Sequence, residues 1–144
     1  MTDKTASALI HEAILAQHRA YVPYSHFRVG AALLCSDGTI YQGCNIENSS
    51  YGAANCAERT AFFKAVYDGH RDFDAIAIVG NPEGSDIYDY CPPCGICRQV
   101  MAEFCDGEKF QVILAKSETD YRIYPLKEIL PFAFTPKNLI RDEG

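Results

Sequence analysis

Two short cysteine patterns, each at the start of an expected helix, constrain this chain more than any other feature. Cys94 and Cys97 form a C-x-x-C pattern, and residues 97–104 have helical composition. Cys56 opens a second helical segment, expected over residues 56–67. The backbone N–H groups at a helix start favour the thiolate form of cysteine. Because thiolates are metal ligands, the two patterns together predict three sulfur ligands for one zinc ion.

The number of sulfur ligands indicates which kind of zinc site to expect. A structural site uses four protein ligands, whereas a catalytic site keeps the fourth position open for water. Three cysteines leave that position open, which favours a catalytic zinc. Cys91 lies close to Cys94 in the sequence and stays possible as a fourth ligand. The histidines show no ligand spacing to either pattern; they are His11, His18, His26 and His70.

Glu58 and Arg59 supply what a catalytic zinc needs besides its ligands. Glu58 follows Cys56 by two residues, and a carboxylate there can take a proton from metal-bound water and deliver it elsewhere. Three thiolates donate strongly and make zinc a poor Lewis acid unless a cation offsets them. Arg59 can do so by donating hydrogen bonds to the ligand sulfurs. We therefore expect Glu58 to be the proton shuttle and Arg59 to contact the sulfurs.

The rest of the chain predicts one α/β domain, over residues 1–144. Thr5 and Ser7 are candidate caps of the first helix, and Ser36-Asp37-Gly38 is suited to a hairpin turn. Strands alternate with helices, which is typical of layers built around a single sheet. Helices are expected over 5–20, 56–67, 97–104 and 126–130, strands over 28–34, 39–43, 73–79, 110–115 and 121–124, and loops over 45–55 and 80–93.

Composition narrows the classes of partner. The formal net charge is -6 and no run of basic residues occurs, so we expect a small neutral ligand rather than a nucleic acid. The first residues do not show the basic-then-apolar pattern of a signal peptide, and no apolar stretch reaches the roughly 18 residues that span a membrane, so we expect neither feature. Seven cysteines without a secretion signal favour a reducing, cytoplasmic setting. Those outside the zinc patterns, Cys35, Cys44, Cys91 and Cys105, are expected to be buried or spare thiols.

The pattern Cys56-Ala-Glu58…Pro93-Cys94-Gly-Ile-Cys97 resembles the signature of the zinc nucleobase deaminases. Longer strings are similar to the small homotetrameric cytidine deaminases, and the resemblance covers about residues 5–134. These strings are CAERTA, PCGICRQVMAEF, YSHFRVG at 24–30, GCNIENSSY at 43–51 and LPFAF at 130–134. The resemblance implies a three-layer α/β/α fold with a mixed five-stranded sheet. It also implies one zinc per subunit and a homotetramer with active sites at subunit interfaces.

The resemblance further implies an activity and a set of substrate-binding residues. The expected reaction is hydrolysis of cytidine and 2′-deoxycytidine to uridine and 2′-deoxyuridine with release of ammonia, a step of pyrimidine salvage. Ser49 and Phe132 depart from the usual residues at their positions. By position, Asn45 and Glu47 match the residues at the ribose 3′-hydroxyl, Phe27 the aromatic beside the base, Tyr51 a substrate-loop residue, Ala57 a backbone contact to the base and Phe134 an aromatic from a neighbouring subunit.

Three alternatives remain open at the level of the sequence. A deaminase of a blasticidin-type cytosine antibiotic would share three cysteines, the glutamate and the small size. A non-enzymatic zinc module or a thiol redox protein built on Cys94 and Cys97 would explain the cysteines but would leave Glu58 without a role. Arg59 and the pair of Asn45 and Glu47 favour the nucleoside enzyme.

Overall fold

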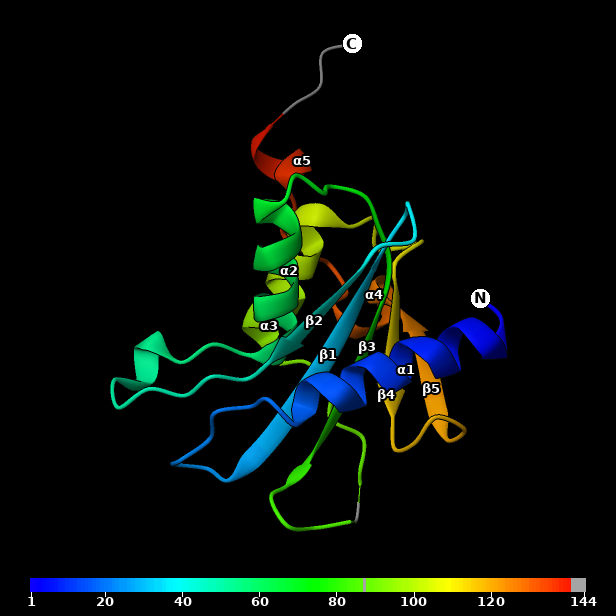
Figure 1. The fold of residues 1–144 in the computed structure, drawn as a ribbon. Coiled ribbons are helices and arrows are strands. Elements are labelled where there is room, and N and C mark those ends of the chain that lie inside the picture. Colours follow the sequence, from blue (N-terminus) through cyan, green and yellow to red (C-terminus); the bar gives the residue numbers. More distant parts are fainter. Residues whose placement is uncertain (87, 141–144) are drawn as a thin grey trace.

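A mixed five-stranded sheet organises the chain (Figure 1). The computed structural model describes residues 1–86 and 88–140. The strand order is β2-β1-β3-β4-β5, and only the β3–β4 pair is parallel among these described strands. The strand bounds are β1 Phe27–Cys35, β2 Ile40–Cys44, β3 Phe73–Pro82, β4 Gln111–Ala115 and β5 Tyr121–Pro125.

Helices cover both faces of the sheet, which gives the expected three-layer α/β/α arrangement (Figure 1). Side chains alternate along β3, so that Ala75 and Ala77 pack with α1 while Ile76 and Ile78 pack with α2 and α3. Among the described residues, none of the helices combines the length and apolar character that a membrane crossing requires. The helix bounds are α1 Asp3–Gln17, the 3-10 helix η1 Tyr51–Ala53, α2 Ala57–Tyr67, α3 Gly95–Phe104, α4 Leu126–Ile129 and α5 Pro136–Leu139.

Most predicted elements agree with the structure to within one residue at each end, but the bounds of α1, β3 and α3 differ by more, and two short helices were not predicted. α1 begins before Thr5, because the Thr2 hydroxyl caps it by accepting a hydrogen bond from the Thr5 N–H at 3.2 Å. α1 also stops at Gln17 rather than continuing to residue 20. The helices α5 and η1 were not expected. The prediction of a single domain over residues 1–144 stays a prediction, because 141–144 lie outside the described ranges.

The length of β3 also differs from the prediction. The strand continues to Pro82, whereas a loop was expected from residue 80, because β1 offers partners down to the Phe27–Pro82 pair. Asn81 is polar and looked like a loop residue, yet its side chain is buried and hydrogen-bonded within the structure. A polar residue therefore occupies a strand position here because a partner satisfies it.

That partner belongs to a buried amide network that sequence periodicity did not reveal. Gln17 is fully buried, and its Nε2 donates to Asn81 Oδ1 at 2.6 Å and to the Arg28 carbonyl at 3.0 Å. The Tyr88 hydroxyl donates to Gln17 Oε1 at 3.0 Å. One side chain thus joins α1, β1, β3 and the segment that leads to Cys94.

Gly43 allows β2 and α2 to approach each other closely. A Cβ atom at this position would lie 2.2 Å from the carbonyl oxygen of Ala57 and 2.6 Å from the nitrogen of Ala61, and both are backbone atoms of α2. Backbone cannot move aside as a flexible side chain can. The glycine therefore sets how near the first turn of α2 lies to the sheet.

We expect Gly43→Ala to destabilise the protein by about 1–3 kcal/mol, the usual cost of overpacking a filled interior. Urea unfolding followed by circular dichroism measures the change. Gly52→Ala is the matched control, because a Cβ atom there meets nothing within 4 Å. Equal unfolding midpoints for the two variants would contradict the close-approach argument.

Candidate active site

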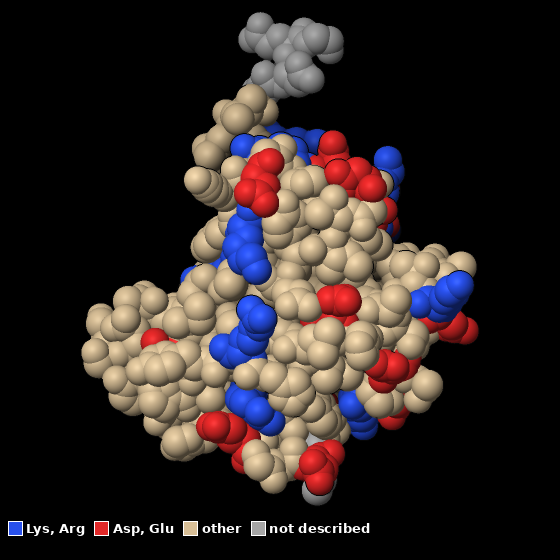
Figure 2. Space-filling view, in the orientation of Figure 1, with Lys and Arg blue, Asp and Glu red and all other residues tan. Residues whose placement is uncertain are grey.

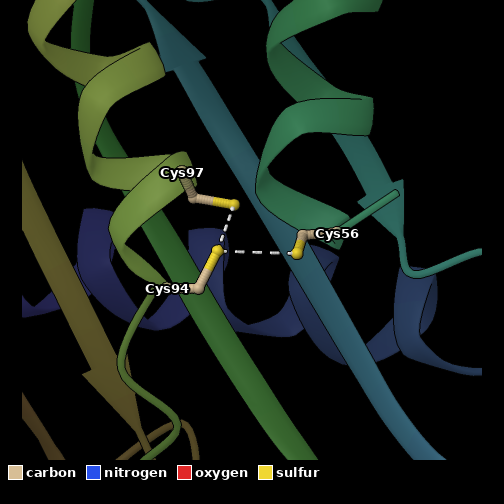
Figure 3. Close-up of side chains that lie close together, drawn as sticks. All are labelled: Cys56, Cys94 and Cys97. Carbon is tan, nitrogen blue, oxygen red and sulfur yellow. Dashed lines mark hydrogen bonds between the residues drawn. The ribbon is translucent and has the colours of Figure 1, made fainter. Parts of the chain in front are cut away.

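The sulfur atoms of Cys56, Cys94 and Cys97 converge between the starts of α2 and α3 (Figure 3). The Cys56 and Cys94 sulfurs are 3.8 Å apart, and the Cys94 and Cys97 sulfurs are 3.5 Å apart. All three atoms lie within 4.8 Å of one another. Cys97 is buried whereas Cys94 is exposed, so the cluster opens to solvent on one side.

Helix capping explains why these cysteines meet. Cys56 is the N-cap of α2 and Cys94 is the N-cap of α3, so α3 begins two residues earlier than predicted. Cys97 lies in the first turn of α3. Each N-cap side chain points past the end of its helix, where unpaired N–H groups favour negative charge.

Contacts with neighbouring segments fix both helix starts. Arg98 donates from Nε to the Pro93 carbonyl at 2.8 Å and from Nη1 to the Ile129 carbonyl at 2.5 Å. On the other helix, Asn55 donates to the Thr60 hydroxyl at 3.1 Å, and that hydroxyl donates to the Cys56 carbonyl at 3.1 Å. The cysteine positions are therefore set by hydrogen bonds that do not involve the sulfurs.

The geometry of the cluster fits zinc. Tetrahedral Zn²⁺ with Zn–S bonds of about 2.3 Å places its sulfur ligands about 3.8 Å apart. The Cys56–Cys94 and Cys94–Cys97 sulfur separations, 3.8 and 3.5 Å, are close to that value. Bonded sulfurs would be about 2.05 Å apart, and all seven cysteines are free. Three thiols leave the fourth tetrahedral position for water or substrate, as in catalytic sites.

Hydrogen bonding within the cluster already favours a thiolate. The bond from Cys97 is the largest of several effects that lower the pKa of Cys56 to about 5, and a bond from Arg59 adds to it against the opposing effect of burial. The pKa of Cys97 is raised for the reciprocal reason, because its proton is shared with Cys56. Thiolate is the form that binds zinc.

Glu58 lies in the first turn of α2 and is 4% exposed. Burial raises the pKa of its carboxyl to about 7, and the neighbouring Cys56 thiolate acts in the same direction. A zinc ion on the sulfurs would favour the carboxylate again, because its positive charge lies close by. A group that can hold or release a proton near neutral pH suits acid–base catalysis.

Arg59 contacts the sulfur cluster as expected. Its Nη2 donates to the Cys56 sulfur at 3.3 Å. The Nε atom is buried and has no hydrogen-bond partner among the described residues. The guanidinium thus places a fixed positive charge against a ligand sulfur, which offsets part of the negative charge that three thiolates bring.

Cys91 does not join the three sulfurs. The group of potential ligand atoms within 4.8 Å of one another contains Cys56, Cys94 and Cys97 alone. The Cys91 side chain instead packs beside Gly80, where Phe27 also lies, and burial raises the pKa of its thiol to about 12. Cys91 therefore lines the space next to the cluster. It does not occupy the fourth coordination position that three sulfur ligands leave open.

Asn45 and Glu47 lie in the segment between β2 and α2, which projects away from the sheet (Figure 1). Asn45 accepts a hydrogen bond from the Val29 N–H at 2.9 Å and donates one to the Phe27 carbonyl at 2.9 Å. Glu47 Oε1 accepts hydrogen bonds from two successive backbone N–H groups, those of Tyr24 at 3.0 Å and Ser25 at 3.1 Å. Hydrogen bonding from Ser25 lowers the pKa of Glu47 and keeps it charged.

The structure leaves several expected substrate residues on the surface of the chain. Phe27 is 36% exposed at the start of β1, and Tyr51 is 79% exposed in η1 with its ring edge-on to Tyr24 at 6.3 Å. Ala57 is buried at the first position of α2. Phe134 is 57% exposed and lies beyond α4, with its carbonyl accepting a hydrogen bond from Gln99.

Fold and site together place the chain among the zinc-dependent hydrolytic deaminases. The sequence profile described as the cytidine and deoxycytidylate deaminase zinc-binding region matches residues 3–113, so the chain belongs to that family. It is 54% identical over 131 residues to a cytidine deaminase of Sporosarcina psychrophila, covering 91% of this chain and 92% of the relative. A cytidine deaminase of Halalkalibacterium halodurans is 52% identical over 131 residues, covering 91% of this chain and 95% of that relative. The crystal structure of cytidine deaminase from Burkholderia pseudomallei superposes with a TM-score of 0.80 at 46% identity, covering 93% of this chain and 100% of that chain.

Several residues that shape this site were not predicted from the sequence. Arg98 holds the start of α3, and Thr60 holds the start of α2. Each is an ordinary helix residue in the sequence, and neither falls in a spacing pattern. A search for polar side chains within one turn of an N-cap cysteine would have found both.

Arg59→Gln should release zinc more easily, because it removes the charged donor to the Cys56 sulfur. Loss of a residue that supports a metal ligand typically costs about 10- to 100-fold in metal affinity or activity. Competition with a chromogenic chelator measures the affinity. Arg19→Gln, which removes an exposed arginine on another segment, is the control and should hold zinc as the unmodified protein does. Equal zinc retention by both variants would contradict a role of Arg59 in zinc binding.

Proposed function

We propose that this protein hydrolyses cytidine and 2′-deoxycytidine to uridine and 2′-deoxyuridine with release of ammonia. The observation that carries the proposal is the buried Glu58 carboxyl beside three converging thiols at two helix N-termini. The names of relatives at up to 54% identity agree with it. We assign the zinc to Cys56, Cys94 and Cys97, with one ion per subunit.

Cys56, Cys94 and Cys97 would hold the zinc, which would lower the pKa of a bound water and so make it a nucleophile. Glu58 takes the proton that this water loses and delivers it to N3 of the base, which makes C4 more electrophilic. A second proton from the added oxygen passes through Glu58 to the exocyclic amino group, and the C4–N bond then breaks to release ammonia. One water is consumed for each ammonia formed, and Glu58 ends in its starting state.

Glu47 and Asn45 are proposed to bind the ribose 3′-hydroxyl. Two backbone N–H groups hold Glu47 Oε1, so the other carboxylate oxygen can accept a hydrogen bond from the sugar. The carboxylate would repel a phosphate at the same place, which favours nucleosides over nucleotides. On the face drawn in Figure 2, basic side chains form a narrow column with acidic groups around it, over a largely uncharged surface. With a formal net charge of -6, this arrangement does not favour a polynucleotide substrate.

The base is proposed to lie between Phe27, the backbone of Ala57 and an aromatic ring from another subunit. Phe132 is fully exposed with a φ of 54°, and Phe134 is 57% exposed nearby in sequence. A solvated position for two large apolar rings is unfavourable. We propose that both rings are buried against a neighbouring subunit of a homotetramer whose active sites lie at subunit interfaces, with Tyr51 in the loop that covers the substrate.

A reducing compartment suits the proposed site, because oxidation of any ligand thiol would remove zinc binding. All seven cysteines are free, and the cluster is exposed at Cys94. We therefore propose a cytoplasmic role in pyrimidine salvage.

Glu58→Gln should keep stoichiometric zinc and lose at least about 10²- to 10⁴-fold in kcat, the usual worth of general acid–base catalysis. Loss of ultraviolet absorbance from cytidine measures turnover, and elemental analysis measures zinc. Glu103→Gln, which changes an exposed glutamate of α3, should leave both values unchanged. Near-normal turnover of Glu58→Gln would contradict the proposed role of Glu58 in proton transfer.

The same assay decides between substrates. A blasticidin-type antibiotic lacks the ribose that Glu47 and Asn45 are proposed to bind. Faster turnover of the antibiotic than of cytidine would therefore favour the alternative deaminase. Turnover of neither, with zinc bound, would favour a non-enzymatic module.

The interface proposal predicts complementation between two defective chains. Phe134→Ala should lower kcat/KM by roughly 5- to 150-fold, since stacking on a base is worth about 1–3 kcal/mol. Co-expressed Glu58→Gln and Phe134→Ala chains should recover about a quarter of normal activity, because random mixing gives some sites an intact residue from each subunit. Activity no greater than the sum of the separate variants would place Phe134 outside the neighbouring site.

A further inference from the structure

A second group of metal-ligand side chains lies at the opposite end of α2 from Cys56. It consists of Cys35, Asp37 and His70, whose ligand atoms all lie within 4.8 Å of one another. His70 Nδ1 and Asp37 Oδ2 are 3.7 Å apart. Cys35 ends β1, Asp37 lies in the β1–β2 turn, and His70 follows α2. The group therefore joins a hairpin of the sheet to the end of a helix that packs on it.

Backbone geometry holds His70 in place. Gly69 adopts a φ of 97°, and its N–H donates to the Val66 carbonyl at 3.0 Å. The His70 N–H donates to the Ala65 carbonyl at 3.0 Å. These two bonds are the Schellman pattern that ends a helix, which fixes the residue after the glycine. The backbone that carries the His70 imidazole is therefore held in one conformation.

Backbone hydrogen bonds of the hairpin turn likewise hold the other two potential metal ligands, Cys35 and Asp37. Gly38 adopts a φ of 94° and its N–H donates to the Cys35 carbonyl at 3.0 Å. The Thr39 N–H donates to Asp37 Oδ1 at 3.0 Å, which leaves Oδ2 directed at His70. Both metal-ligand residues of the turn are therefore positioned before any cation binds.

The charge around the group leaves it open to a cation. Among the ranges 1–86 and 88–140, no lysine or arginine forms an ion pair with Asp37. Arg71 is adjacent to His70 in sequence, but its Nη1 donates to the carbonyls of Val66 and His70 instead. Asp37 is exposed and His70 partly so, which gives a cation a path from solvent.

We propose that Cys35, Asp37 and His70 bind a second divalent cation of borderline softness, such as Zn²⁺ or Co²⁺. Sulfur, imidazole nitrogen and carboxylate oxygen are all ligands of such ions, whereas Mg²⁺ and Ca²⁺ take oxygen. A thiolate and a carboxylate also balance the two positive charges. Binding clamps the β1–β2 turn to the end of α2, so the cation stabilises the layer that carries Cys56 at its other end.

The chain contains its own control for an ordinary surface pair. His11 Nδ1 lies 2.7 Å from Glu118 Oε1, closer than His70 to Asp37, but within the described part of the chain no cysteine completes a three-ligand group there. If histidine–carboxylate pairs alone held the cation, His11→Asn and His70→Asn would have equal effects. The proposal predicts that only the change at His70 matters.

The test is equilibrium dialysis of the zinc-loaded protein against excess Co²⁺, with zinc and cobalt counted together. Exchange at the catalytic cysteines does not raise this total. The unmodified protein and His11→Asn should hold about two ions per chain, while His70→Asn and Asp37→Asn hold about one. The added cobalt should give a thiolate-to-cobalt charge-transfer band and raise Tm in the first pair only.

A total of about one ion in the unmodified protein would overturn the proposal. So would a second ion that persists in His70→Asn or that gives no thiolate band beyond the one from exchanged catalytic cobalt. Asp37 is exposed and His70 is partly exposed, and deaminase activity with cytidine reports that the variants are folded. Because the site is remote from Glu58, activity should be similar in all four proteins, and failure of the second site leaves the proposed reaction untouched.

Discussion

The N-termini of α2 and α3 meet over one point of the sheet, and the chemistry of the chain depends on this meeting. Cys56 and Cys94 are the two N-caps, so each helix presents a sulfur and a set of unpaired N–H groups to the same volume. The helix starts are fixed independently of the sulfurs, α2 by the close approach at Gly43 and α3 by the two bonds of Arg98. The site is therefore preorganised, and zinc need not collect its ligands from flexible segments.

This arrangement explains why the first turn of one helix holds two acidic groups whose pKa values are shifted in opposite directions. In the proposed mechanism Cys56 stays ionised and Glu58, two residues on, exchanges protons, and the pKa of Cys56 is lowered while that of Glu58 is raised. The N-cap sulfur faces helix N–H groups and the Arg59 guanidinium, which favour negative charge. Glu58 is buried instead, and desolvation disfavours its charge. The short sequence CAER thus contains the proposed ligand Cys56, the proposed proton carrier Glu58 and the cation Arg59 that contacts the ligand sulfur.

Much of this could be predicted from the sequence, because capping and strand patterns are local. The strands, the two cysteine helices and the three-sulfur group all followed from spacing. The extension of β3 through Asn81 could not, because a buried amide is acceptable only when Gln17, far away in the chain, satisfies it. The length of α1 depended on the Thr2 hydroxyl rather than on apolar periodicity. The positions of Asn45 and Glu47 near β1 and the Tyr24–Ser25 backbone also required the fold, since those bonds join segments about twenty residues apart.

The parallel pairing of β3 with β4 has a consequence for the order of events when the chain folds. Parallel neighbours need a crossover connection, and here the crossover contains Cys94, Cys97 and α3. Cys56 belongs to the preceding β1–β2–α2 segment, so the three sulfurs meet only after these two halves of the chain have docked. Contacts between such distant segments form slowly, since chain closure must precede them. Tight metal capture therefore marks nearly complete folding, and the free energy of zinc binding stabilises the assembled fold rather than either half.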